Sequence, residues 1–173
     1  MKRMIFIFAL SVIPFFVGAQ DFIDDMFSKY SGNDNFTSIV ISKNLLDFAF
    51  AIDKEKENGL EKLKGKISDL KILISEKKSD ISTQFADEIR NNISKNSFLT
   101  LIEIIDGKKK VNLYVKKDNE IIVHLLLVAT EEDQNVLLSL KGQFSKKDLA
   151  EIGRGTNVNG SFNHLSYLRN LEK

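Results

Sequence analysis

The stretch FLTLIEIIDGKKKVNLYVKKDNEIIVHLLLVATEEDQNVLLSL, residues 98–140, decides the fold. It contains four runs rich in aliphatic and β-branched residues, separated by short polar clusters that are typical of turns. The pair Asp106-Gly107 between the first two runs is a strong hairpin signal. We therefore predict an antiparallel meander of four strands. The strands cover residues 98–105, 111–116, 121–129 and 135–140.

Two of these strands differ in the faces that they can bury. Val111, Leu113 and Val115 alternate with polar residues, so one face of that strand should contact water. Residues 121–129 are apolar on both faces apart from His124, which favours a central position. A sheet face that helices do not fully cover would leave an apolar patch, and such patches usually mark partner sites.

The residues before the meander show helical spacing in three places and strand patterns in two. Helices are predicted over residues 21–30, over residues 43–52 after a cap at Ser42, and over residues 81–93 after a cap at Ser79 or Asp80. Strands are predicted over residues 36–41 and 67–74. Either strand could join either edge of the meander. The charged residues 53–66 lack apolar side chains that could dock, which indicates an exposed loop or a frayed helix extension.

Two short helices are predicted after the meander. Ser145 should cap the first of them, and Asp148 stands three residues later, where a capping box places its acid. Apolar residues recur at helical spacing in residues 162–171 and indicate the second. Mixed helices and strands followed by consecutive strands predict an α+β fold. We expect a mainly antiparallel sheet of five to six strands, with helices packed mostly on one face.

The chain begins with a pattern typical of a secretory signal peptide. Lys2 and Arg3 precede an apolar run that ends in small residues before Gln20. The run is shorter than the roughly 20 apolar residues that a membrane-spanning helix needs. We therefore expect residues 1–19 to be cleaved. Residues 20–173 should form a single domain that is exported to the periplasm or outside the cell.

The composition excludes several classes of function. The chain has 25 Lys and Arg residues against 24 Asp and Glu residues, so no global charge attracts it to nucleic acid. It has no cysteine, which excludes disulfides, thiol catalysis and a lipid-bearing thiol. We therefore expect neither a nucleic-acid partner nor a lipoprotein. No run after the signal is long enough to predict a transmembrane segment.

Few residues are candidates for catalysis. Neither His124 nor His164 lies in a recognisable catalytic pattern, and the sequence contains no G-x-S-x-G. His124 is expected to be a hydrogen-bonded residue of the core or the sheet surface. Paired carboxylates could act as acid and base, but nothing singles out one pair. We predict no catalytic and no cofactor-binding residues.

Metal sites are equally weakly indicated. Asp53, Glu55 and Glu57 have the spacing of the first ligands of a calcium loop. However, Lys64 stands where that loop needs a bidentate acid. The acidic cluster of residues 131–133 could bind calcium weakly, although acid-rich turns are usually only solvated. We predict no metal site.

Several segments, taken in order, carry a family resemblance. They are Phe27–Gly32, Thr37–Lys43, Leu70–Leu73, Asn119–Leu127, Leu137–Gly142 and Asp148–Ile152. With these segments the chain resembles the secreted Bacteroidota family catalogued as the domain of unknown function numbered 4252. The resemblance implies a location in the cell envelope and a single domain. It implies no activity, no cofactor and no catalytic residues.

Three functions are compatible with these observations. The leading hypothesis is a non-enzymatic binding or interaction module of the cell envelope, with an envelope protein or a second copy as its partner. The second is a carrier of a small apolar ligand, because the chain has thirteen Phe residues and no Trp. The third is a hydrolase that uses carboxylates or a metal.

Overall fold

The computed structural model describes residues 21–52, 63–76 and 80–155. In chain order the elements are α1 (Phe22–Tyr30), β1 (Phe36–Ser42), α2 (Lys43–Ile52), β2 (Ile67–Ser75), α3 (Asp80–Lys95), β3 (Leu99–Asp106), β4 (Lys109–Asp118), β5 (Ile121–Thr130), β6 (Asn135–Phe144) and α4 (Lys146–Gly155). No helix in these ranges is long and apolar enough to cross a bilayer. The predicted signal peptide, the cap at Ser79, the calcium-loop acids, His164 and the helix over residues 162–171 lie outside the described residues.

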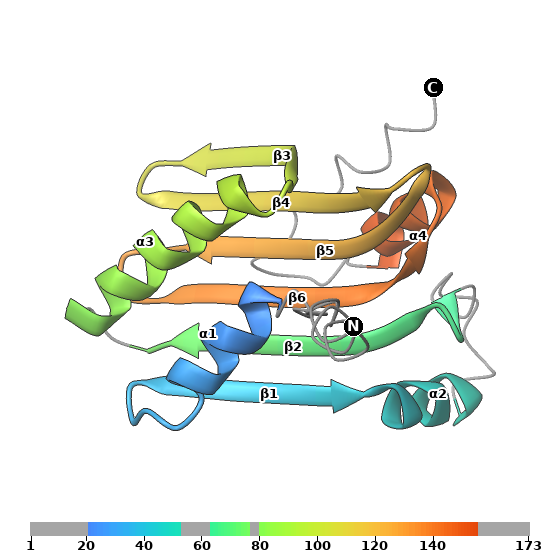
Figure 1. Ribbon diagram of the computed structural model, residues 1–173, viewed down its shortest axis with the longest axis horizontal. Helices are drawn as coiled ribbons and strands as arrows, with labels where there is room; N and C mark the ends of the chain where they lie inside the picture. The colour runs from blue at the N-terminus through green and yellow to red at the C-terminus, as the bar shows by residue number, and fades with distance from the viewer. Residues whose placement is uncertain (1–20, 53–62, 77–79, 156–173) are drawn as a thin grey trace, which may run out of the picture.

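The strands form one sheet in the order β1-β2-β6-β5-β4-β3, and every neighbouring pair is antiparallel (Figure 1). The structure thus confirms the predicted α+β fold with a mainly antiparallel sheet. Strands β3 to β6 form the predicted meander. The early strands both extend the β6 edge, because β2 pairs with β6 and β1 pairs with β2.

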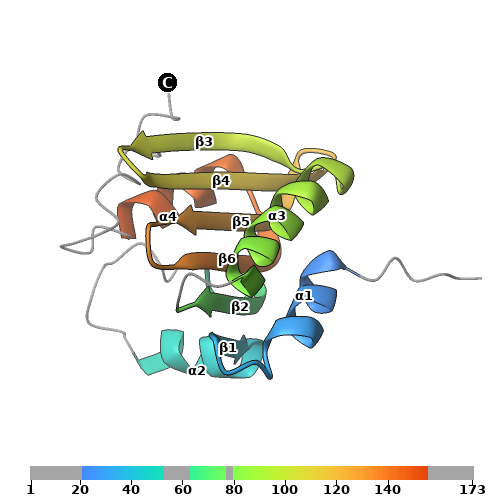
Figure 2. The same cartoon turned by 90° about the vertical axis from the view of Figure 1, so that its left-hand side faces the viewer.

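Helices α1 and α3 cover one face of the sheet, which we call the front face (Figures 1 and 2). Apolar side chains of both helices meet strand residues there in one core. Rings of Tyr30, Phe36 and Phe85 pack against one another with centroids 4.8–5.1 Å apart. The helical spacing of Phe85, Ile89 and Ile93 predicted this buried stripe, because residues four apart lie on one helix face.

A second core lies on the opposite face, which we call the back face, beneath α4 at one end of the sheet (Figure 2). Leu149 of α4 packs there with Phe144 and with strand residues such as Leu125. Leu63 is also part of this core and is only 2% exposed. The prediction of an exposed segment over residues 53–66 is wrong for Leu63, because the chain just before β2 turns back onto the sheet.

Gly142 is required where this core meets β6. A Cβ atom at this position would lie 2.3 Å from the main-chain oxygen of Lys66 and 2.5 Å from the Phe144 ring. The same Lys66 oxygen accepts a hydrogen bond of 2.9 Å from the Gln143 N–H. Only glycine therefore lets the chain before β2 approach β6 this closely.

Two local predictions are confirmed in detail. Ser145 and Asp148 form a reciprocal capping box, in which the Ser145 N–H donates to Asp148 Oδ2 (2.8 Å) and the Asp148 N–H donates to Ser145 Oγ (3.3 Å). The β3–β4 hairpin forms as predicted, but its two loop residues are Gly107 and Lys108, because Asp106 pairs with Lys109. Gly107 has φ +58°, a conformation that glycine adopts without strain.

Candidate functional site

The back face of the sheet is built from cross-strand rows of apolar residues. The strand registers place one residue of each strand in a row. From β1 to β3, the first row consists of Ile39, Ile72, Leu138, Leu127, Leu113 and Ile102. The second consists of Thr37, Ile74, Val136, Ala129, Val111 and Ile104. We call these two rows the apolar rows, since eleven of their twelve side chains are apolar.

The apolar rows differ from the neighbouring part of the back face in what packs on them. The next row along the strands includes Leu140 and Leu125, which lie in the core with Leu149 of α4 and Leu46 of α2. In the apolar rows, Leu113, Leu127 and Ala129 form the centre of a separate apolar cluster. Among the residues that the structure describes, every member of that cluster comes from a strand. No described helix therefore contributes to it.

The apolar rows become more exposed toward the edges of the sheet. Leu113, Leu127 and Ala129 at the centre are buried, with exposed fractions of 6–7%, and the residues of β2, β6 and β3 in these rows are half-buried. Ile39 on the edge strand β1 is 40% exposed. Six strands spaced at about 4.8 Å make a surface roughly 24 Å wide. A helix laid across it would need about 16 residues, at a rise of about 1.5 Å each. The surface thus has the size and chemistry to pack against an amphipathic helix.

The front face carries a polar cluster where α1 begins. The Nε2 atom of His124 lies 2.7 Å from Ser139 Oγ, and its Nδ1 atom lies 3.6 Å from the Asp21 carboxylate. Lys141 reaches the same carboxylate at 3.0 Å. Asp21 also caps α1 by accepting a hydrogen bond from the Ile23 N–H (3.1 Å). A carboxylate beside Nδ1 favours the tautomer protonated there, so Nε2 accepts the Ser139 hydroxyl.

Burial determines how this cluster titrates. Burial lowers the pKa of His124 from 6.5 to about 4, and the Asp21 carboxylate opposes this only in part. For Asp21, burial alone would raise the pKa. The hydrogen bonds from Lys141 and from the Ile23 N–H, with the nearby positive charge, hold it below its ordinary value. The imidazole is therefore neutral near pH 7 and Asp21 is ionised.

The order Ser139, His124, Asp21 is that of a hydrolase triad, but the geometry does not serve hydrolysis. Ser139 is 1% exposed and lies within β6, which is paired on both sides by β2 and β5. A nucleophilic serine needs substrate access and free N–H donors for an oxyanion. Neither exists at a buried residue in the middle of a sheet. We therefore assign the cluster a structural role, which is to fasten the start of α1 to the sheet.

Sequence reasoning anticipated a hydrogen-bonded His124 but missed both of its partners. Asp21 is 103 positions from His124 in the chain, and no local pattern indicates such a contact. Ser139 could have been noticed as the one polar residue in the apolar run Val136–Leu140. A polar residue within a central strand needs a hydrogen-bond partner, and a histidine in the neighbouring strand is an obvious one.

The acidic cluster of residues 131–133 lies on the β5–β6 turn. Glu132 pairs with Lys108 at 2.9 Å, and Glu131 pairs with Lys109 at 3.4 Å. In the part of the chain that the structure describes, no three His, Asp or Glu side chains are placed to bind one metal ion. Lys108 and Lys109 thus neutralise the β5–β6 turn in part, whereas Lys110 pairs with Glu103.

Comparison with known proteins gives one match. The sequence model of a family described as a domain of unknown function, DUF4252, matches residues 30–152. No curated protein and no solved structure matches the chain. The match begins at the end of α1 and ends within α4, so it includes all six strands.

Proposed function

The chain belongs to the DUF4252 family, and from its sheet geometry we propose that it is a non-enzymatic interaction module of the cell envelope. The site that we assign to this function is the pair of apolar rows on the back face. The partner is a protein that lays the apolar side of an amphipathic helix across the strands. The N-terminal sequence pattern of residues 1–19 supports export.

A single observation carries this proposal. Eleven apolar side chains on six adjacent strands form one continuous surface, and the helices of the described chain pack elsewhere. A sheet with an apolar face is normally stabilised by a second layer packed on it. Ile39 at one end of this surface is exposed, most of its other side chains are half-buried, and Leu113, Leu127 and Ala129 at its centre are buried. Apolar side chains that stay open on a sheet face typically mark protein-binding sites. A helix is the favoured second layer because a helix layer already covers the front face.

The aromatic residues do not favour a ligand carrier. Phe22 and Phe98 pack edge to face with centroids 5.8 Å apart, and Phe36 and Phe85 do so at 5.1 Å. These rings fill the front-face core. They therefore contribute to stability, as expected for aromatic residues in a close-packed interior.

The proposal can be tested by cross-linking at two adjacent residues. Ile39 and Val40 are neighbours on β1, are 40% and 59% exposed, and point to the back and front faces respectively. A photo-reactive residue at position 39 should capture one specific envelope protein in living cells. The same residue at position 40 should not, although it is more exposed. Equal capture at both positions would contradict the proposal.

A pair of charge substitutions gives the matching loss of function. In the variant Ile39→Lys/Ile104→Lys, each lysine stands at one end of the apolar rows, and the captured protein should no longer co-purify. The control Val40→Lys/Ile105→Lys adds the same charges to the same edge strands on the front face, where Ile105 is 68% exposed. Its co-purification should be unchanged. If a chain ending at Gly155 binds the partner and the full chain does not, residues 156–173 occupy the surface and the proposal fails for the full chain.

A further inference from the structure

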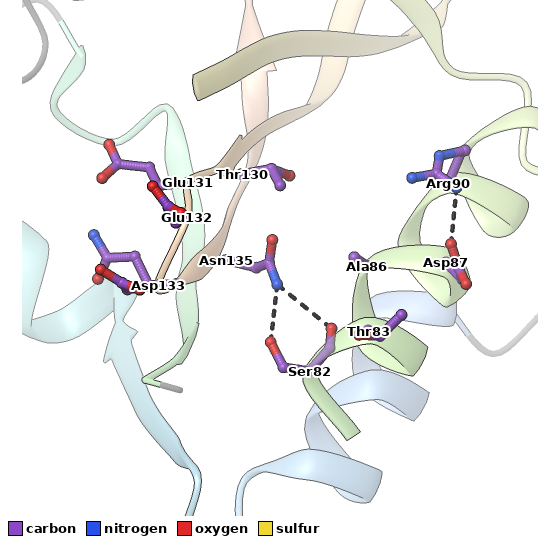
Figure 3. Close-up of a pocket in the computed structure, with 11 residues that line it drawn as sticks. Ser82, Thr83, Ala86, Asp87, Arg90, Thr130, Glu131, Glu132, Asp133 and Asn135 are labelled. Atoms are coloured by element: carbon purple, nitrogen blue, oxygen red, sulfur yellow. Dashed lines mark hydrogen bonds and ion pairs between the residues drawn. The ribbon is translucent and has the colours of Figure 1, made fainter. Parts of the chain in front are cut away.

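A cleft unrelated to the apolar rows lies at the opposite end of the sheet from α4. It is formed by α3 and by the β5–β6 turn, and its volume is about 200 Å³ (Figure 3). A water molecule in the liquid fills roughly 30 Å³. The cleft therefore has room for a short aliphatic chain with one polar group.

The floor of the cleft is the side chain of Asn135, which is 8% exposed. Its amide nitrogen donates to Ser82 Oγ at 3.0 Å and to the Ser82 main-chain oxygen at 3.4 Å. Its main-chain N–H donates to Ser75 Oγ at 3.1 Å. These bonds fix the orientation of the Asn135 side-chain amide. The main-chain oxygen of Ser82 can only accept a hydrogen bond, so it must face the amide nitrogen of Asn135. The Asn135 oxygen is thereby turned away from Ser82.

The Asn135 oxygen is the feature that points to a ligand. Among the described residues, it is the one buried side-chain polar atom for which no hydrogen-bond partner is present. Figure 3 shows it directed into the cleft, between Thr130 and Ala86. Buried acceptors are nearly always paired, since an unpaired one destabilises the fold. The partner that this atom requires is a hydrogen-bond donor.

The charges around the cleft indicate what kind of donor would bind. Four carboxylates line it, from Asp87 and residues 131–133, against one guanidinium, that of Arg90. Arg90 is held by Asp87 at 2.8 Å. Lys108 and Lys109, which pair with two of the turn acids, line a neighbouring groove and not this cleft. Asp133 has no ion pair within the described ranges. The local potential is therefore negative.

We infer that this cleft binds a primary ammonium group, which donates a hydrogen bond to the Asn135 oxygen and is attracted by the acidic rim. An ammonium has three donors and no acceptor, which suits a site whose unpaired buried atom is an acceptor and whose carboxylates outnumber its cationic groups. Unlike a metal ion, an ammonium group does not need three or more carboxylate or imidazole ligands that converge on one point. This inference does not depend on the proposed interaction function.

The test is a titration of the ¹⁵N-labelled protein, purified after export, with n-butylammonium and separately with n-butanol. The ammonium ion should shift backbone amide signals of residues 82–90 and 130–135, whereas the alcohol of the same shape should not. Asp133→Asn should weaken binding roughly two- to fivefold, the range for one exposed charge. Asp118→Asn removes the same charge at the other end of the sheet and should have no effect.

A second variant keeps the test independent of charge. Ala86→Leu places a larger side chain in the cleft at a half-buried position of α3, and it should abolish the ammonium shifts while the remaining spectrum stays unchanged. A tighter response to Nα-acetyl-lysine amide than to putrescine would identify a protein side chain as the natural source, and the reverse would identify a free amine. Three results would overturn the inference. They are equal shifts with butanol, shifts that persist in Ala86→Leu, and the absence of shifts at about 100 mM ammonium, a concentration at which even a weak site would be partly occupied.

Discussion

The front and back faces of the sheet differ in the polarity of their strand residues and in the helices that pack on them. The front face is the more polar one, since its rows include Lys71, Ser139, Lys141 and His124, yet two helices cover it. The back face is almost wholly apolar along the apolar rows, and no described helix packs there. Whether a helix packs on a face therefore does not depend only on the polarity of the strand residues. It also depends on the side chains that the helix contributes to the contact.

Helix α1 shows how a polar surface can be covered. Its Asp24 pairs with Lys71 and, at 3.4 Å, with Lys141, so that the strand lysines meet opposite charge. The same helix buries Phe22, Ile23, Met26, Phe27 and Tyr30 against the sheet. Apolar contact supplies the driving force, while ion pairs and hydrogen bonds satisfy the polar groups that the contact buries. The back face needs no such matching, so any partner with a sufficiently apolar surface can pack on it.

The largest expected effect contrasts the cores of the two faces. Phe85→Ala removes a fully buried ring that contacts Tyr30 and Phe36, and should lower the free energy of unfolding by about 3–5 kcal/mol. Ile72→Ala in the apolar rows should cost less, about 1–2 kcal/mol, because Ile72 is only half-buried in the described chain. Urea denaturation of both variants measures the two values. Equal losses would show that the back face is as completely covered as the front.

The next effect is a loss of stability between pH 6.5 and 4, which among the described residues comes from His124 on the front face. His124 has a pKa of about 4 in the folded chain against 6.5 when exposed, so the unfolded chain binds more protons between these values. Stability is then complete above pH 6.5 and decreases as the pH falls toward 4, by about 3 kcal/mol. Asp21, Asp24 and Glu88 have lowered pKa values, so their contribution is lost only at still lower pH.

Chemical denaturation at several pH values measures this slope. His124→Gln should flatten the part between pH 6.5 and 4 and leave the part below pH 4 in place. A wild-type stability that does not change between pH 7 and pH 5 would contradict a neutral, buried His124.

A smaller effect tests whether the polar cluster is structural. Ser139→Ala leaves His124 Nε2 buried without its partner and should destabilise the fold by about 1–2 kcal/mol. A serine nucleophile would instead react with a fluorophosphonate probe. Labelling of the wild-type protein that disappears in Ser139→Ala would contradict the structural role.

The smallest expected effect on stability belongs to the apolar rows. Ile39→Lys changes a 40% exposed residue on an edge strand and should alter the free energy of unfolding by about 0.5 kcal/mol or less. The same substitution is expected to weaken partner binding strongly. A large loss of stability from Ile39→Lys, but not from Val40→Lys, would show that another part of the chain packs on this edge.

The sequence by itself determined the elements and the local pairings. Alternating residues and turn signals predicted the β3–β6 meander, and Ser145 with Asp148 predicted the cap of α4. These features depend on contacts between residues that are close in the chain, so their signals are local. The same alternation shows that Leu127 and Ala129 share a face, but it cannot show which face a helix will cover.

The tertiary structure alone decided which edge β1 and β2 joined, where Leu63 docked, and how Asp21, His124 and Ser139 met. Each of these outcomes depends on segments that are far apart in the chain, as with the 117 positions between Asp24 and Lys141. Pairing of this kind is chosen by the total fit of side chains over a surface, and no short pattern encodes it. For the same reason, the apolar rows became visible as one surface only when six strands, each unremarkable alone, were placed in register.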